Sequence, residues 1–345
     1  MTTGRDIIAA FAQGTTWGTA VSANAAGKGI YILSEGLPLK SGEHLRNEEL
    51  AHYFMENVDL GNVDFAGDIS AFLRYQGLDT LIAIAMGTAG SPIQQGGTLA
   101  WKHIWKLSNT LTGLFGTLAI DKGVSIWEYP SVKTHGFVIT CEAGQPAQIT
   151  FNMIADDLVR SNDGSPVNTS LASVTYATNA LRLLFDKATF RINAQSGGAL
   201  GVGDVVNISR FTLTYNRPKS GLHVLGQTTV LEPTGDAVPD VRLEVGVDEY
   251  TTDAFLNDLR LGTAKKADIY FDSGIEAGTA YDYDFRISLP HLIPVEGSAP
   301  LSSAGKIVES VTFEAIKAAS NPTGMTDRGP FYIEVINKLA TNPLL

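Results

Sequence analysis

Two pairs of aspartates are the clearest candidates for chemistry in this sequence. Asp282 and Asp284 alternate with apolar residues in the run from Tyr281 to Leu289. Asp268 and Asp272 repeat the pattern a short way upstream. Side chains two residues apart in a strand share a face, so Asp282 and Asp284 could share a cation or do acid–base work. Rows of this kind are also typical of a solvated, acidic sheet face, and that interpretation is the one we favour.

The other residue types that catalyse reactions or bind metals form no recognisable motif. The six histidines are scattered, and none belongs to a His-Glu-x-x-His sequence. The single cysteine, Cys141, alternates with Phe137 and Ile139, which indicates a core position. One cysteine allows neither an intrachain disulfide nor a cysteine-based zinc site. We therefore predict no catalytic, cofactor-binding or metal-binding residues, and expect that the chain is not an enzyme.

A carbohydrate-active or carbohydrate-binding β-sandwich is one alternative that these residues leave open. Trp101 and Trp105 could form a platform for a sugar if they met Asp282 and Asp284 in one cleft. Two carboxylates about 5–10 Å apart are the arrangement that cleaves glycosidic bonds. The tryptophans also fit an alternating segment, which favours core or interface positions for them.

The elements that must position these side chains are mostly strands. Apolar and polar residues alternate in many short segments, a pattern that buries one face of a strand. These segments are 63–75, 135–142, 148–153, 188–193, 211–215, 241–248, 281–289, 311–315 and 331–335. Two others favour short helices, at about 79–86 before Gly87 and about 253–261 before Gly262. The predicted fold class is mainly β: a β-sandwich or split barrel with one or two short flanking α-helices.

Two departures from simple alternation carry further expectations. Between Val206 and Tyr215 the apolar positions change from even to odd numbers, which predicts a bulge near Ser209 and Arg210. The segments 63–86 and 241–261 both read as a strand followed by a short helix. This recurrence suggests a weak internal duplication, although strand–helix–strand units could also simply recur in one large sheet.

The predicted organisation is an N-terminal arm, 1–28, and a β domain, 29–345. The duplication, if present, would divide the domain into 29–220 and 221–345. The stretch around Trp17 is small and polar, so we expect the arm to order by packing on a neighbouring molecule. The small-residue segment 296–305 is expected to be a loop between two strands.

Composition narrows the classes of function. The 345 residues carry a formal net charge of −11, and only 18% are charged, below the roughly 25% of an average soluble protein. A surface poor in charge suggests that much of it is covered by other molecules. An acidic chain does not suit wrapping around nucleic acid, but it suits a conduit that repels phosphates. We expect neither a signal peptide nor a membrane span.

The order of the segments resembles the major tail protein, or tail tube protein, family of siphophages. The resemblance begins at Thr15-Thr16-Trp17-Gly18-Thr19-Ala20, which looks like the family's opening Thr-x-x-Gly-Thr element. It continues through the strand from Gly67 and the Leu-rich helix that ends at Gly87. Later segments that fit are 135–152, 188–192, 211–216, 287–290 and 310–315.

The resemblance implies a structural virion protein. Its inner sheet would contribute to an oligomeric β-barrel tube, built of stacked homo-oligomeric rings of usually six copies, through which phage DNA passes into the host. A ring of three duplicated chains is a minor alternative. The implied partners are tape-measure, terminator and baseplate proteins, with no specific DNA binding, no membrane and no cofactors. The implied location is the virion tail, after synthesis in the host cytoplasm. A baseplate hub or capsid decoration protein is a further alternative.

Within this picture, particular residues receive provisional roles. The acidic side chains expected to face the lumen are Asp268, Asp272, Asp282 and Asp284. The residues expected at contacts between rings are Trp17, Glu296, Gly297 and Ser298.

Overall fold

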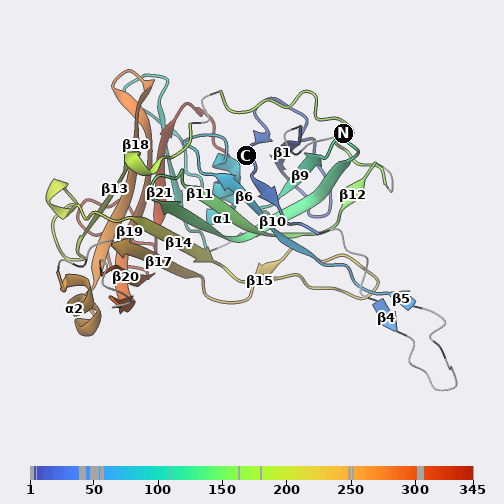
Figure 1. The fold of residues 1–345 in the computed structure, drawn as a ribbon. Helices are drawn as coiled ribbons and strands as arrows, with labels where there is room; N and C mark the ends of the chain where they lie inside the picture. The colour runs from blue at the N-terminus through green and yellow to red at the C-terminus, as the bar shows by residue number, and fades with distance from the viewer. Residues whose placement is uncertain are drawn as a thin grey trace.

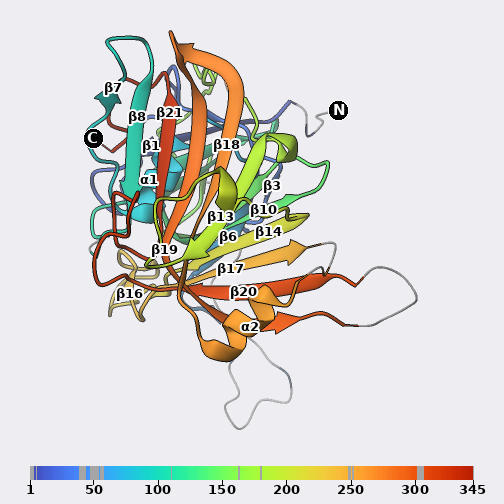
Figure 2. The same cartoon turned by 90° about the vertical axis from the view of Figure 1, so that its left-hand side faces the viewer.

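Most of the regular secondary structure is antiparallel strand, arranged in three connected sheets (Figures 1 and 2). The computed structural model describes residues 4, 6–38, 44–46, 54, 58–109, 111–161, 164–178, 181–247, 250, 252–300 and 307–344. The mainly β, sandwich-like fold predicted from the alternating segments is confirmed. Alternation produces this architecture because each strand buries one row of side chains and leaves the other row polar.

The largest sheet, here called the long sheet, contains strands from both halves of the chain. Its order is β3 (Ser34–Glu35), β6 (Phe65–Phe72), β11 (Gln148–Ala155), β10 (Ile126–Glu142), β14 (Arg210–Asn216), β17 (Asp240–Val247), β20 (Glu309–Ala315) and β19 (Tyr281–Ser298). Strand β6 is shorter than the predicted 63–75. The two halves meet where β10 pairs with β14.

A second sheet, the crossing sheet, packs over one end of the long sheet, and its strands run steeply across it (Figure 2). Its order is β13 (Ala188–Ala194), β18 (Lys265–Gly278), the first part of β19, β21 (Tyr332–Asn337), β8 (Trp101–Lys106) and β7 (Ile93–Gln94). Such orthogonal packing is one of the two stable ways to stack sheets.

The third, N-terminal sheet contains part of the stretch 1–28 that was predicted as an arm. Its order is β2 (Gly29–Ile30), β1 (Ile8–Gln13), β9 (Gly116–Asp121), the first part of β10 and β12 (Val159–Arg160). Strand β1 pairs with β9 from Ile8 to Gln13, and residues 9–12 are buried. The alanines of this strand are small enough to be covered on both faces, so this part of the N-terminus is incorporated into the chain's own sheet.

Strands β10 and β19 connect the sheets. They have 17 and 18 residues, and each pairs with different neighbours along its two parts. The register of β10 shifts between Tyr129 and Val132, and that of β19 between Pro294 and Glu296. Such irregularities bend a strand and let it leave one sheet for another. Across the described residues, the pairings branch at these two strands but do not close into a barrel.

The two predicted α-helices are confirmed. Helix α1 (Asp79–Met86) ends at Gly87 and α2 (Ala254–Leu261) ends at Gly262, and both glycines are left-handed, a conformation that suits glycine at a helix end. Helix α1 is buried at seven of its eight positions, whereas none of the eight residues of α2 is buried. Two 3-10 turns, η1 (Phe185–Lys187) and η2 (Val202–Asp204), flank β13.

Two small hairpins complete the described secondary structure. They are β4 (His44–Arg46) with β5 (Val58–Leu60), and β15 (Lys219–Ser220) with β16 (Thr234–Gly235). The β4–β5 hairpin lies away from the body of the molecule (Figure 1). Its Leu45 and Leu60 are 49% and 65% exposed.

The bulge predicted near Ser209 and Arg210 is wrong. Strand β14 begins at Arg210, and its pairings with β10 and β17 show no register shift. The preceding Val206 instead donates its backbone N–H to the carbonyl of Phe190 in β13. The parity of the apolar residues changes because the chain moves from the crossing sheet to the long sheet, and the two sheets bury different faces.

Candidate assembly surfaces

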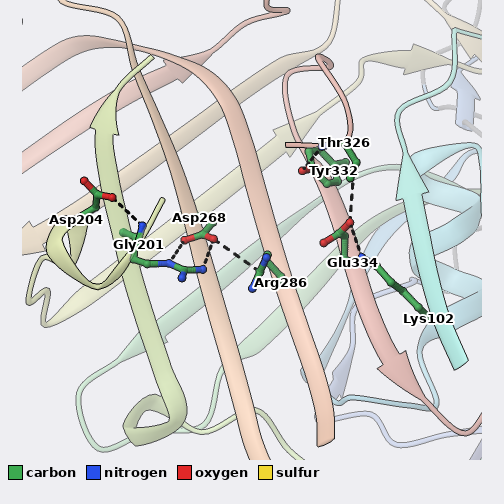
Figure 3. Close-up of polar contacts among 9 residues, drawn as sticks. Lys102, Gly201, Asp204, Asp268, Arg286, Thr326, Tyr332 and Glu334 are labelled. Carbon is green, nitrogen blue, oxygen red and sulfur yellow. Dashed lines mark hydrogen bonds and ion pairs between the residues drawn. The ribbon is translucent and has the colours of Figure 1, made fainter. Parts of the chain in front are cut away.

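The outer side of the crossing sheet, here called the charged face, holds side chains in ion pairs (Figure 3). Asp268 on β18 accepts hydrogen bonds from both Nε and Nη2 of Arg191 on β13, and its Oδ2 lies 3.7 Å from Nε of Arg286 on β19. On the next strands, Glu334 lies 3.0 Å from Nζ of Lys102. Arg191 lies directly opposite Asp268, whereas Arg286 and Lys102 reach their partners diagonally across neighbouring strands. These cross-strand pairs compensate charge along the face, because neighbouring groups of opposite sign attract each other.

All four predicted lumen aspartates lie on this charged face, but they divide into two environments. Asp268 is only 4% exposed and is compensated by arginines. Asp272 and Asp284 are directly opposed in the β18–β19 pairing, and Asp282 lies opposite Glu276. Burial, followed by the neighbouring Asp272, raises the pKa of Asp284 to about 6. The acidic character of this face is therefore concentrated at one end of the β18–β19 hairpin.

The cleft required by the carbohydrate alternative is absent for these residues. Trp105 is 1% exposed and lies opposite the buried Ile333 of β21, on the core side of the crossing sheet. Asp284 lies opposite Ile336 of the same strand, on the outer side. Because neighbouring residues of a strand point to opposite faces, Trp105 and Asp284 do not converge. Within the described residues, no group of three His, Cys, Asp or Glu side chains could hold a metal ion.

The long sheet has a second polar surface, here called the hydroxyl face, which sequence reasoning missed. Serine and threonine side chains, each partly exposed, occupy its non-core positions on five of its strands, β6, β11, β10, β14 and β20. They are Ser70, Thr150, Thr140, Thr212, Thr214, Thr312 and Ser310. The signal was in the sequence, since threonine alternates with core residues in these segments, but alternation does not tell which strands will be neighbours.

The charges on the hydroxyl face are predominantly acidic. Its two arginines already have acidic partners: Arg210 lies 3.3 Å from Glu244, and Arg242 lies 3.1 Å from Asp240. Further acidic side chains occupy non-core positions of the same sheet: Asp68, Glu142, Glu296 and Glu314. Among its described residues the face is thus hydrophilic and rich in hydroxyls, and its acidic side chains outnumber its basic ones.

Trp17 is occupied within its own chain. Its indole Nε1 donates a 2.9 Å hydrogen bond to the carbonyl oxygen of Val230, and its ring packs edge-on against Phe115 with a centroid separation of 5.3 Å. The adjacent Gly18 donates its backbone N–H to Oγ of Ser131. These contacts anchor the segment after β1 to the body of the molecule.

Glu296, Gly297 and Ser298 lie in a strand, which corrects the prediction that a loop begins at 296. They form the last part of β19 and pair with Thr312, Val311 and Ser310 of β20. The loop was predicted because the residues are small and polar, but the β20 edge extends far enough to pair with them. Residues 301–306 of the predicted loop lie outside the described residues.

Two edges of the long sheet have no partner strand in the described part of the chain. At one end, β3 pairs only with β6. At the other end, the last part of β19 pairs only with β20, while α2 lies on its core side, with Leu256 and Leu259 over Gly297. An unpaired edge presents backbone N–H and C=O groups to other chains.

These features define a structural β-sandwich with polar sheet faces and free sheet edges. The sequence model of a family described as phage tail tube protein matches residues 4–315, and the chain belongs to this family. It is therefore a structural protein of the phage tail. A search of curated proteins found no match. Neither α1 nor α2, the α-helices of the described residues, is long and apolar enough to cross a membrane.

Proposed function

We propose that this chain is the repeating subunit of the tail tube: it assembles into stacked rings whose central channel conducts phage DNA into the host. Family membership is the observation that carries the proposal. The low content of charged residues and the two free edges of the long sheet also suit a surface that is largely covered in an assembly. Tape-measure, terminator and baseplate proteins would meet the tube within the same virion tail.

The hydroxyl face is the better candidate for the channel wall. A wall that conducts DNA must be wetted and must not bind phosphate, so hydroxyls and uncompensated carboxylates suit it. On the charged face, by contrast, Asp268 is buried in ion pairs with two arginines. The four aspartates predicted for the lumen would then lie on the opposite side of the sandwich, facing outward.

The number of chains in a ring depends on how many sheet units each chain contributes to the channel wall. The resemblance implies six units around the channel. Six chains with one unit each, or three chains with two units each, would satisfy this number. The long sheet includes strands from both halves of the chain in a repeated order, which favours three chains. Rings would stack through projecting hairpins such as β4–β5, whose described leucines are exposed.

Electron microscopy of the purified protein at high concentration, with light scattering in parallel, tests the proposal. We expect hollow tubes or stacked rings with a central channel, and a ring mass of three chains. Kosmotropic salt can be added to favour assembly, because it strengthens the burial of apolar surface. A closed oligomer that never stacks would overturn the proposal in favour of a hub or decoration protein.

Cysteine labelling of assembled tubes tests which face lines the channel. The native Cys141 is buried, so introduced cysteines give the signal. Thr312→Cys on the hydroxyl face should react with a small maleimide but not with a maleimide on a large polymer. The matched variant Asp282→Cys on the charged face should react with both reagents. The reverse pattern would place the charged face in the lumen.

A further inference from the structure

The two halves of the long sheet repeat one topology. In the first half, β6 pairs with β11, β11 with β10, and β10 with β9. In the second half, β17 pairs with β20, β20 with β19, and β19 with β18. Strands β6 and β17 both have eight residues and are followed, at equal spacing, by eight-residue helices that end at a left-handed glycine.

The repetition extends to the strand that begins each unit. Strand β3 pairs with β6, and β14 pairs with β17. In each case a small hairpin, β4–β5 or β15–β16, lies between the two strands in the sequence. One unit is therefore β3–β6–β11–β10 and the other is β14–β17–β20–β19. This assignment places the boundary between the units before β14 rather than at residue 220.

The units are joined by an internal junction, the antiparallel pairing of β10 with β14. It runs from Gly136 opposite Asn216 to Glu142 opposite Arg210. The last strand of the first unit thus pairs with the first strand of the second unit. The corresponding strands at the outer ends of the sheet are β19 and β3, which are the two free edges.

Helices α1 and α2 differ in burial, and the absence of a neighbouring molecule beside α2 would account for the difference. Helix α1 lies beside the internal junction, and its Ala85 carbonyl is 3.4 Å from the hydroxyl of Tyr215 on β14, the first strand of the second unit. Helix α2 holds the equivalent place beside β19, but Leu261 is 64% exposed. The β3 segment that would correspond to β14 has Tyr31 and Leu33, 45% and 47% exposed. Exposed apolar side chains at both ends could cover each other.

We propose that the β19 edge of one copy pairs antiparallel with the β3 edge of a second copy, and that this contact repeats the geometry of the internal junction. The partner is the same chain, and the contact is head-to-tail, so it can close into a ring. It would continue the long sheet and its hydroxyl face from copy to copy and bury α2 under the β3 segment of the neighbour. This inference deepens the proposed function and rests on it.

The register of the contact can be derived from the internal junction. Thr140 lies opposite Thr212 in that junction. Ser298 on β19 corresponds to Thr140 on β10, because both lie on the hydroxyl face and at matching places along their strands. Ser298 pairs with Ser310 near the start of β20, and Thr140 pairs with Gln148 at the start of β11. Ser34, opposite Ser70 on β6, corresponds to Thr212, opposite Glu244 on β17. Ser298 of one copy should therefore lie opposite Ser34 of the next.

Disulfide cross-linking tests this register. Residues directly opposite in antiparallel strands have Cβ atoms about 4.5–5.5 Å apart, and a modest local adjustment brings them to disulfide distance. The variant with Ser34→Cys and Ser298→Cys, assembled and mildly oxidised, should form disulfides between chains. A denaturing gel without reductant should show a ladder of multiples of the chain mass. The variant with Thr140→Cys and Thr212→Cys is the matched control and should cross-link within one chain only.

A second control tests the register, and a measurement on the unaltered protein tests the edges. Ser34→Cys with Ile293→Cys displaces one cysteine along β19 and should cross-link at least tenfold less. In the unaltered chain, hydrogen exchange at 33–35 and 296–298 should slow on assembly. Assembled rings without cross-links in the Ser34/Ser298 variant, or with unchanged exchange at these edges, would overturn the inference alone. Absence of rings and tubes under all conditions would overturn the proposed function as well.

Discussion

Replacing Asp268 with asparagine tests whether this predicted lumen residue has a structural role instead. Its carboxylate is 4% exposed. Nε of Arg191 donates to Oδ1 at 2.8 Å, and Nε of Arg286 lies 3.7 Å from Oδ2. Asparagine has nearly the same shape but removes the negative charge and one acceptor. The variant leaves two guanidinium groups without their shared counter-ion.

The magnitude follows from the burial of the three groups. Breaking a buried ion pair by removing one partner costs about 3–5 kcal/mol. The side chain of Arg191 is 17% exposed, but that of Arg286 is 36% exposed, so water can partly solvate the second guanidinium. We therefore expect the lower end of the range, about 3 kcal/mol. With a urea m-value of about 3 kcal/mol/M, this lowers the unfolding midpoint by about 1 M.

The assay is urea unfolding of unassembled protein at neutral pH, followed by tryptophan fluorescence. Glu244→Gln is the matched control, because Glu244 and Arg210 form an ion pair of 3.3 Å whose side chains are 45% and 48% exposed. Exposed pairs contribute about 0–1 kcal/mol, so this control should hardly move the midpoint. The reasoning is refuted if Asp268→Asn shifts the midpoint no more than Glu244→Gln does.

Three further predictions concern stability and assembly. Burial raises the pKa of Asp156 to about 7, so the folded state loses stability as the pH rises from about 4 to 7. Asp156→Asn should make the thermal unfolding temperature depend less on pH over this range, and an unchanged pH dependence would contradict the prediction. Phe137→Ala should cost about 3–5 kcal/mol in urea unfolding, because Phe137 contacts three aromatic rings; a cost under 1 kcal/mol would contradict this. A Cβ at Gly67 would meet the backbone of Gly36, so Gly67→Ala should displace β3 and abolish tubes in electron micrographs while costing only about 1–3 kcal/mol; normal tubes would contradict it.

The local structure was largely predictable because local signals determine it. Alternation located the main strands, since burial of one face requires period two. Gly87 and Gly262 located the ends of both helices, since few other residues adopt the left-handed conformation that ends them. Family membership was also recognisable from the order of segments.

Errors arose where a residue's surroundings depend on distant parts of the chain. The parity change before Arg210 was interpreted as a bulge, although it marks a passage between two sheets. Trp17 was predicted to contact a neighbouring ring, and its contacts with Val230 and Phe115 of its own chain were not foreseen. The four aspartates considered for the lumen lie on one face, but the arginines that compensate Asp268 come from other strands and were not foreseen.

By itself, the sequence determined the fold class, many of the strands, both α-helices and the family, because these depend on the order and period of residues along the chain. Only the tertiary structure decided which strands are neighbours. Pairing between β10 and β14 joins segments far apart in the sequence, and alternation is the same whichever strand lies alongside. The hydroxyl face, the repeated units and the two free edges all follow from that pairing, so they became visible only in the folded chain.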